Sequence, residues 1–258
     1  MKLRSKWLLT LLLACGFTTP AFAAEWGDLK GRFVYDGTAP KPAPMTITKD
    51  IECCGQYQAE IVDQRLLVGE TGGLQNVFVY LKASDEAQPE VHSDYVAAAA
   101  KPTKIDNLHC MFYPHGVGLW AGKQSLLVIN SDPIGQAVKL DCTKNASINA
   151  LMPVGGQVEA KFDVGETLPR MVSCGVHPWE SAYLLIHSNP YFAVSDKEGN
   201  FVIKNIPAGE WTFQFWQEKA GYLVAKPEWE KGRAVLTIKA GENDLGEVKC
   251  SPDLFNKE

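Results

Sequence analysis

A thiol, an imidazole and a carboxylate recur at every third residue in one short stretch, at Cys174, His177 and Glu180. The residues between them include Gly175 and Pro178, which favour a loop over a regular element. Thiolate sulfur and imidazole nitrogen are donors that suit copper or zinc better than calcium or magnesium. The pattern therefore indicates a metal site on a tight loop.

A loop of this kind needs flanking elements to hold its side chains together. Residues 168–173 precede it and residues 181–186 follow it, and we predict both runs to be β-strands. Two strands joined by a short loop can aim three side chains at one point.

The stretch resembles the Cys-x-x-His-x-x-Met copper loop of amicyanin-type cupredoxins, which joins the last two strands of a β-sandwich. A blue-copper centre also needs a second imidazole. The resemblance places it at the fifth residue of Asp132-Pro-Ile-Gly-Gln136. Gln136 therefore stands where this histidine is expected, and Glu180 stands where the axial methionine is expected. The resemblance implies metal ligands at Cys174, His177, Glu180 and Gln136, two of them altered.

Further stretches, in the same order, resemble a bacterial family described as plastocyanin-like or methylamine-utilisation-type proteins. They are residues 27–40, 72–81, 110–115, 130–133, 168–186, 190–194 and 216–223. This family implies copper binding and electron transfer with a redox partner protein. Within Trp216-Gln217-Glu218 the family's histidine is also replaced, by Gln217.

The altered ligands change the expected metal chemistry. An amide oxygen is a poor ligand for soft or borderline metals, so Gln136 is a weak substitute for an imidazole. A Cys/His/Glu set with an amide or water in fourth place is typical of zinc chemistry. We expect copper in an altered type 1-like site, with zinc or no metal as the alternatives.

The whole chain is predicted to be all-β. Strand-like runs at 105–115, 124–130 and 157–163 lead to the Cys174 loop, and we predict a cupredoxin-like sandwich over residues 103–188. Residues 84–102 are predicted to form a surface excursion with one helical turn.

The flanking segments carry a second pattern. The D-x-x-G-x-F stretch at 196–201 and the aromatic strand at 211–216 resemble the carboxypeptidase-regulatory-like, or prealbumin-like, sandwich. We predict that residues 25–85 and 190–250 form this sandwich, with the cupredoxin-like module inserted between its strands. Two sandwiches in tandem are the alternative, and residues 251–258 are assigned to a tail.

The first residues predict export. A basic start, an apolar run over 7–16 and Ala21-Phe-Ala23 are typical of a signal peptide, residues 1–23, cleaved after Ala23. We therefore expect a periplasmic or secreted protein, with a lipid-anchored form through Cys15 as the alternative. No later run reaches about 18 consecutive apolar residues, so the mature chain is not expected to span a membrane.

Six cysteines follow the predicted leader: Cys53, Cys54, Cys110, Cys142, Cys174 and Cys250. An even number in an exported protein suggests disulfides, with 15 possible connectivities. Adjacent cysteines rarely bond each other, so at most one of Cys53 and Cys54 is expected to pair, for example with Cys110. A Cys142–Cys174 bridge is a further hypothesis, and it would replace the metal.

Other function classes find less support. The net charge is −5 and no basic stripe is visible, so no nucleic-acid partner is expected. No phosphate loop, H-E-x-x-H or G-x-S-x-G motif occurs, and no enzymatic activity is expected.

The alternative to a metal protein is a metal-free binding module for a protein or carbohydrate, stabilised by disulfides. Its candidate face consists of aromatic residues: Tyr191, Trp211, Phe213, Phe215, Trp216 and Tyr222. Strand alternation, however, places Trp211, Phe213 and Phe215 together toward a core.

Trp179 is expected to shield the metal loop or to form a docking patch. His115 is a candidate compensating ligand, although a histidine hydrogen-bonded at a strand end is the favoured interpretation.

Overall fold

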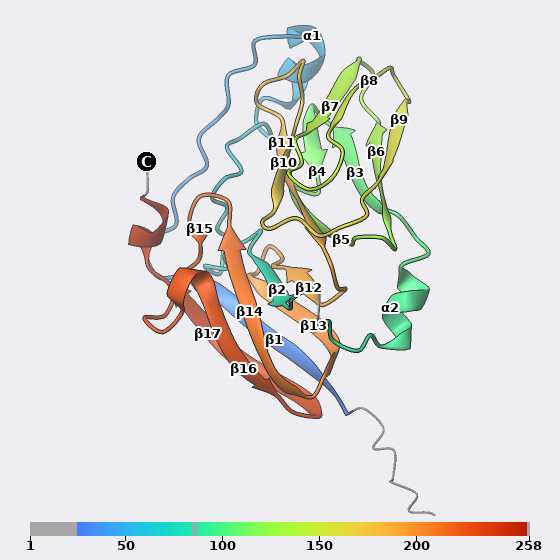
Figure 1. The fold of residues 1–258 in the computed structure, drawn as a ribbon. Helices are drawn as coiled ribbons and strands as arrows, with labels where there is room; N and C mark the ends of the chain where they lie inside the picture. Colours follow the sequence, from blue (N-terminus) through green and yellow to red (C-terminus); the bar gives the residue numbers. More distant parts are fainter. Residues whose placement is uncertain (1–24, 85–86, 257–258) are drawn as a thin grey trace, which may run out of the picture.

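The computed structural model describes residues 25–84 and 87–256. The signal peptide and cleavage site predicted within residues 1–23 lie outside this range. Strands dominate the fold and helices are few and short, so the predicted all-β fold class is confirmed (Figure 1). Within the described ranges, no helix has both the length and the apolar character needed to cross a lipid bilayer.

Two sheets form the sandwich in the lower half of Figure 1, which we call the outer sandwich. One has the order β13-β1-β17, and the other has the order β12-β2-β14-β15 with β16 also paired to β14. Its strands are β1 (Trp26–Tyr35), β2 (Phe78–Lys82), β12 (Phe192–Val194), β13 (Asn200–Pro207), β14 (Gly209–Gln217), β15 (Gly221–Tyr222), β16 (Arg233–Ile238) and β17 (Gly241–Cys250).

The outer sandwich joins segments that are far apart in the chain. β1 pairs antiparallel with β13 and parallel with β17. Alternation along the strands sends one face inward, so Leu29 and Phe33 of β1 share a core with Phe213 and Phe215 of β14. Phe33 and Phe215 meet edge to face, with ring centroids 5.9 Å apart.

Residues between β2 and β12 form a second pair of sheets, the inner sandwich. Its sheets have the orders β5-β11-β10-β7-β8 and β4-β3-β6-β9. Its strands are β3 (Thr103–Leu108), β4 (Met111–Tyr113), β5 (Gly116–Trp120), β6 (Ser125–Asn130), β7 (Gln136–Leu140), β8 (Ile148–Met152), β9 (Gln157–Lys161), β10 (Arg170–Ser173) and β11 (Ser181–His187). The core contains Phe112, Val128, Val138, Val172 and Leu184.

The two sandwiches meet across a small apolar cluster. Phe78 and Trp216 come from the outer sandwich and Leu185 from the inner one. The predicted alternation in β14 is confirmed: Phe213 and Phe215 are fully buried in the core, and Trp216 lies on the opposite face. That opposite face is covered by the inner sandwich, so Trp216 is 7% exposed. The aromatic residues predicted as a binding face are therefore largely buried.

The chain between β1 and β2 crosses the far end of the inner sandwich (Figure 1). It contains α1 (Ile51–Cys54) and a 3-10 turn (Gly55–Tyr57). We call residues 44–62, which include both elements, the cap segment. The disulfide Cys54–Cys110 ties the cap segment to the β3–β4 turn, which confirms the expected pairing of one of the two adjacent cysteines.

Three smaller elements complete the fold. α2 (Ser93–Ala98) confirms the predicted helical turn, and short 3-10 turns occur at Glu230–Gly232 and Pro252–Phe255. Residues 66–68 are rich in β-forming side chains, but only an isolated bridge between Val68 and Leu74 forms there.

His187 couples the two sandwiches and makes stability depend on pH. Its Nε2–H donates to the backbone oxygen of Leu81, at 2.8 Å. Burial lowers the pKa of His187 to about 4, against about 6.5 for an exposed histidine. Between these values the unfolded chain binds more protons, so the free energy of unfolding falls as pH falls, by about 3 kcal/mol in total.

The test is urea denaturation between about pH 7 and 4.5 on the wild type and the His187→Gln variant. Glutamine can donate to Leu81 but does not titrate, so we expect a flatter pH profile for this variant. A wild-type profile that is no steeper than the profile of the variant would contradict the assignment.

Candidate functional site

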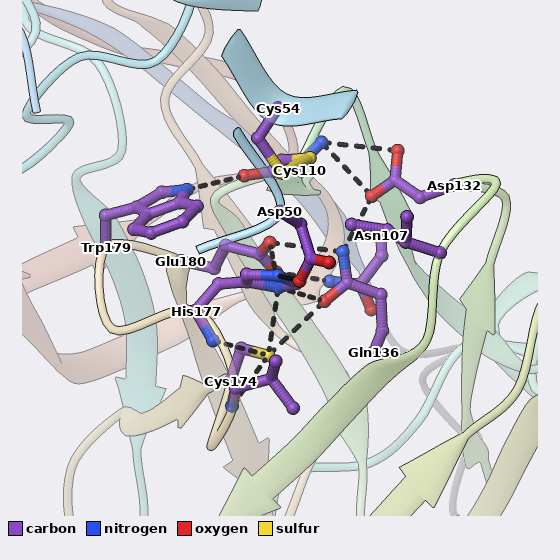
Figure 2. Close-up of polar contacts among 12 residues, drawn as sticks. Asp50, Cys54, Asn107, Cys110, Asp132, Gln136, Cys174, His177, Trp179 and Glu180 are labelled. Carbon is purple, nitrogen blue, oxygen red and sulfur yellow. Dashed lines mark hydrogen bonds and ion pairs between the residues drawn. A yellow bond between two sulfur atoms is a disulfide. The ribbon is translucent and has the colours of Figure 1, made fainter. Parts of the chain in front are cut away.

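The structure brings Cys174, His177, Glu180 and Gln136 together at the capped end of the inner sandwich (Figure 2). Gln136 begins β7, Cys174 directly follows β10, and Glu180 directly precedes β11. Ser173 pairs with Lys139 near the end of β7, so the antiparallel register carries the chain after Ser173 back toward Gln136 at the start of that strand. All four side chains are buried, and the most accessible, Cys174, is 5% exposed.

Their donor atoms converge on one point. His177 Nδ1 is 3.7 Å from Cys174 Sγ, 2.8 Å from Gln136 Oε1 and 3.0 Å from Glu180 Oε1. Cys174 Sγ is also 3.3 Å from Gln136 Oε1. We call these four residues the donor cluster.

The tight loop is held in shape by its own backbone. Cys174 Sγ accepts the backbone N–H groups of Val176 and His177, both at 3.4 Å. The N–H of Cys174 donates to the Glu180 carbonyl, and the N–H of Glu180 donates to the His177 carbonyl. These bonds make the backbone of residues 174–180 turn back on itself. The thiol, the imidazole and the carboxylate therefore face the same side of the loop.

The far nitrogen of His177 is held by a residue that the sequence analysis missed. Asp50 Oδ2 lies 2.8 Å from His177 Nε2, although the two residues are 127 positions apart. Asp50 precedes α1 in the cap segment, in a left-handed backbone conformation (φ 48°). The available signal was the pair Cys53 and Cys54, because a bridge from one of them to Cys110 draws this segment to the inner sandwich.

Two further polar residues, Asn107 and Asp132, accept or donate hydrogen bonds at the donor cluster. Asn107 Nδ2 donates to Glu180 Oε2 at 2.7 Å. Gln136 Nε2 donates to Glu180 Oε1 at 3.1 Å and to Asp132 Oδ2 at 2.8 Å. Among the described side chains, Asn107 Oδ1 is one of two buried polar atoms without a hydrogen-bond partner. The protein groups alone therefore do not satisfy this site completely.

Electrostatics favour a doubly protonated His177 while no cation is present. Burial lowers its pKa, but the hydrogen bonds to Cys174, Glu180 and Asp50 outweigh burial and raise the pKa to about 10. Burial raises the pKa of Glu180, against the opposing effect of His177 and Gln136. A cationic ring thus lies between two acidic side chains in a buried site.

The donor set fits a single soft or borderline metal ion. Sulfur and nitrogen ligands of a tetrahedral zinc ion, at about 2.3 and 2.0 Å from it, are about 3.5 Å apart. The Cys174 Sγ–His177 Nδ1 distance of 3.7 Å is close to this value. The oxygens of Gln136 and Glu180 lie at hydrogen-bond distance from Nδ1, so both must move outward by a few tenths of an ångström.

Other sequence candidates lie outside the donor cluster. His115 bonds to the Ser181 carbonyl at 3.0 Å and to Glu218 at 2.6 Å, as the favoured interpretation expected. Gln217 donates to the Arg65 carbonyl in the outer sandwich. Trp179 is 5% exposed, its Nε1–H donates to the Cys110 carbonyl, and its ring lies 5.1 Å from that of His177. Of the two expected roles it therefore shields the loop and does not form a docking patch.

The hypothetical Cys142–Cys174 disulfide is also wrong, since both thiols are free. Leu140 pairs with Val172 in the antiparallel β7–β10 ladder. Continuing this register places Cys142 opposite Arg170, four residues before Cys174. Four residues of a strand span about 13 Å, beyond the reach of a disulfide.

No protein-family model matches the chain, and no curated protein matches it in sequence. Solved structures resemble part of it. A mutant of amicyanin in the Cu(I) state is 13% identical, with a TM-score of 0.30 over 33% of this chain and 82% of that one. A purple cupredoxin from Nitrosopumilus maritimus is 17% identical, with a TM-score of 0.27 over 33% of this chain and 98% of that one. A copper-containing nitrite reductase from Thermus scotoductus is 13% identical, with a TM-score of 0.30 over 42% of this chain and 25% of that one. These values describe a partial likeness and assign the chain to no family.

The buried contact between His177 and Glu180 predicts a large stability effect. Glu180→Ala leaves the imidazolium, Asn107 and Gln136 without their shared acceptor. We expect a loss of about 3–5 kcal/mol in the free energy of unfolding, measured by urea denaturation. The matched control is Glu60→Ala, which removes an exposed partner of His109 and should cost less than about 1 kcal/mol. Equal losses in the two variants would contradict the assignment.

Proposed function

We propose that this is an exported protein that binds one copper or zinc ion in its buried donor cluster. Cys174 and His177 would supply sulfur and nitrogen, and Glu180 and Gln136 would supply oxygen. The observation that carries the proposal is the convergence of these four side chains on one point, while Asp50 holds the opposite nitrogen of the imidazole.

The Asp50 contact has the form expected of a metal-binding histidine. Such a histidine generally donates its second N–H to a carboxylate or carbonyl, which fixes its tautomer and orientation. With Nε2–H donated to Asp50, His177 directs Nδ1 toward Cys174 and Glu180. Loading the ion requires His177 to lose its Nδ1 proton and Cys174 to become a thiolate, so binding should release protons.

The donor chemistry favours holding an ion over cycling electrons. A blue-copper site uses two imidazoles and a weak axial ligand, whereas this cluster offers one imidazole and a carboxylate. An anionic oxygen donor stabilises Cu(II), and the same set suits tetrahedral Zn²⁺. We therefore assign metal binding to this protein and treat electron transfer with a partner as the secondary role.

Export is supported by two features. The predicted leader over residues 1–23 directs secretion. The Cys54–Cys110 disulfide is of a kind that persists in oxidising compartments. A metal-free sugar- or protein-binding role has weaker support, because Phe213 and Phe215 are fully buried and Trp216 nearly so.

Metal analysis of the mature protein, purified from the periplasm with copper or zinc supplied, tests the proposal. We expect about one equivalent of metal, abolished by Cys174→Ala and retained in Cys250→Ala, which removes another buried free thiol. Metal content near zero in a folded wild-type protein would contradict the proposal.

A second variant tests the geometry of the cluster. In Gln136→His with Glu180→Met, the ligands become two imidazoles, a thiolate and a weak thioether. We expect an intense visible absorption band on addition of Cu(II). A folded double variant that binds copper without such a band would show that the four positions do not share one ion.

A further inference from the structure

Three sulfur atoms gather beside the donor cluster, where Cys110 Sγ also lies within 4.8 Å of a carboxylate oxygen of Glu180. Cys54 and Cys110 form a disulfide, and the sulfur of Cys53 lies within 4.8 Å of both bridge sulfurs. Cys53 is a free thiol. A thiol this close to a disulfide is positioned for thiol–disulfide exchange.

The three cysteines differ in their exposure to solvent. Cys54 and Cys110 are fully buried, so a reductant in solution cannot reach the bridge directly. Cys53 is only partly buried. A disulfide that included Cys53 would therefore place one bridge sulfur within reach of solvent.

We propose that Cys53, Cys54 and Cys110 form a thiol–disulfide exchange site, in which Cys53 relays reduction from a dithiol in solution to the buried bridge. The Cys53 thiol loses its proton and attacks the sulfur of Cys110. The Cys53–Cys110 bond forms as the Cys54–Cys110 bond breaks, and Cys54 leaves as a thiolate that takes up a proton. A dithiol then reduces the Cys53–Cys110 bond and is itself oxidised to a disulfide.

Attack on the alternative sulfur is disfavoured. Exchange at Cys54 would link two adjacent residues in a small ring, which adjacent cysteines rarely form. Exchange at Cys110 only moves the bridge by one residue along α1. The substrate class is thus a small dithiol or a dithiol-containing protein, and the exchange requires no metal.

The site also controls the cap segment. The bridge anchors α1 to the β3–β4 turn, and the backbone oxygen of Asp50 accepts the N–H groups of Cys53 and Cys54. The same residue holds His177 through its carboxylate. Reduction of the bridge removes a covalent tie that keeps this carboxylate over the donor cluster.

The rate of bridge reduction in the folded, metal-free protein tests the relay. The protein is treated with dithiothreitol at about pH 8.5, where thiols ionise more fully, and the new thiols are trapped by alkylation and counted by mass. We expect Cys53→Ala to slow reduction at least about tenfold, because reduction then requires opening of the cap. Cys142→Ala, which removes another partly buried free thiol, should leave the rate within about twofold. Unchanged reduction in Cys53→Ala would overturn the proposal.

A second variant keeps the test decisive if Cys53→Ala is poorly folded. In Cys54→Ala, Cys53 is the remaining sulfur beside Cys110, and we expect peptide mapping to find a Cys53–Cys110 disulfide. Cys53 and Cys110 recovered as free thiols from air-oxidised Cys54→Ala would show that exchange between them cannot occur, and would overturn the relay. Neither measurement depends on metal content, so their failure is distinct from failure of the proposed function.

Discussion

Burial of charged and polar groups is the constraint on which this structure depends. His177 is completely buried, and Glu180 and Gln136 are each only 1% exposed. A buried polar group without a partner destabilises a protein by about 1–3 kcal/mol, and a buried charge by more. Each donor must therefore be met by an acceptor. Because these groups come from β7, the loop after β10 and the cap segment, meeting this requirement fixes how the three segments are placed.

The two sandwiches and the cap segment each hold part of this buried site in place. The inner sandwich supplies the strands whose register sets the donors side by side. The disulfide and the small apolar cluster around Trp179 and Met111 hold the cap segment over them. The outer sandwich closes the opposite end of the inner one through Phe78 and Trp216. The site is thus enclosed by a segment that leaves the outer sandwich after β1 and returns at β2.

Sequence reasoning located the parts of the site that are local or patterned. The spacing of Cys174, His177 and Glu180 predicted a loop that faces one point, and family resemblance added Gln136. Asp50 and Asn107 could not be found in this way, because their contacts with the loop span 127 and 73 residues and leave no periodic signal. The strands β5, β7 and β8 were also not identified. The Cys142–Cys174 hypothesis failed because strand register, which the sequence pattern did not specify, separates the two thiols.

The parallel pairing of β1 with β17 has a consequence for how the chain is made. β1 is the first strand of the described chain and β17 the last, with Gly27 beside Gly241 and Tyr35 beside Cys250. The outer sheet therefore cannot close until nearly the whole polypeptide has been synthesised. Pairings between such distant segments form slowly, since the entropy of closing a long loop must be overcome first. The inner sandwich, built from one continuous stretch, can fold earlier and act as a template for the final closure.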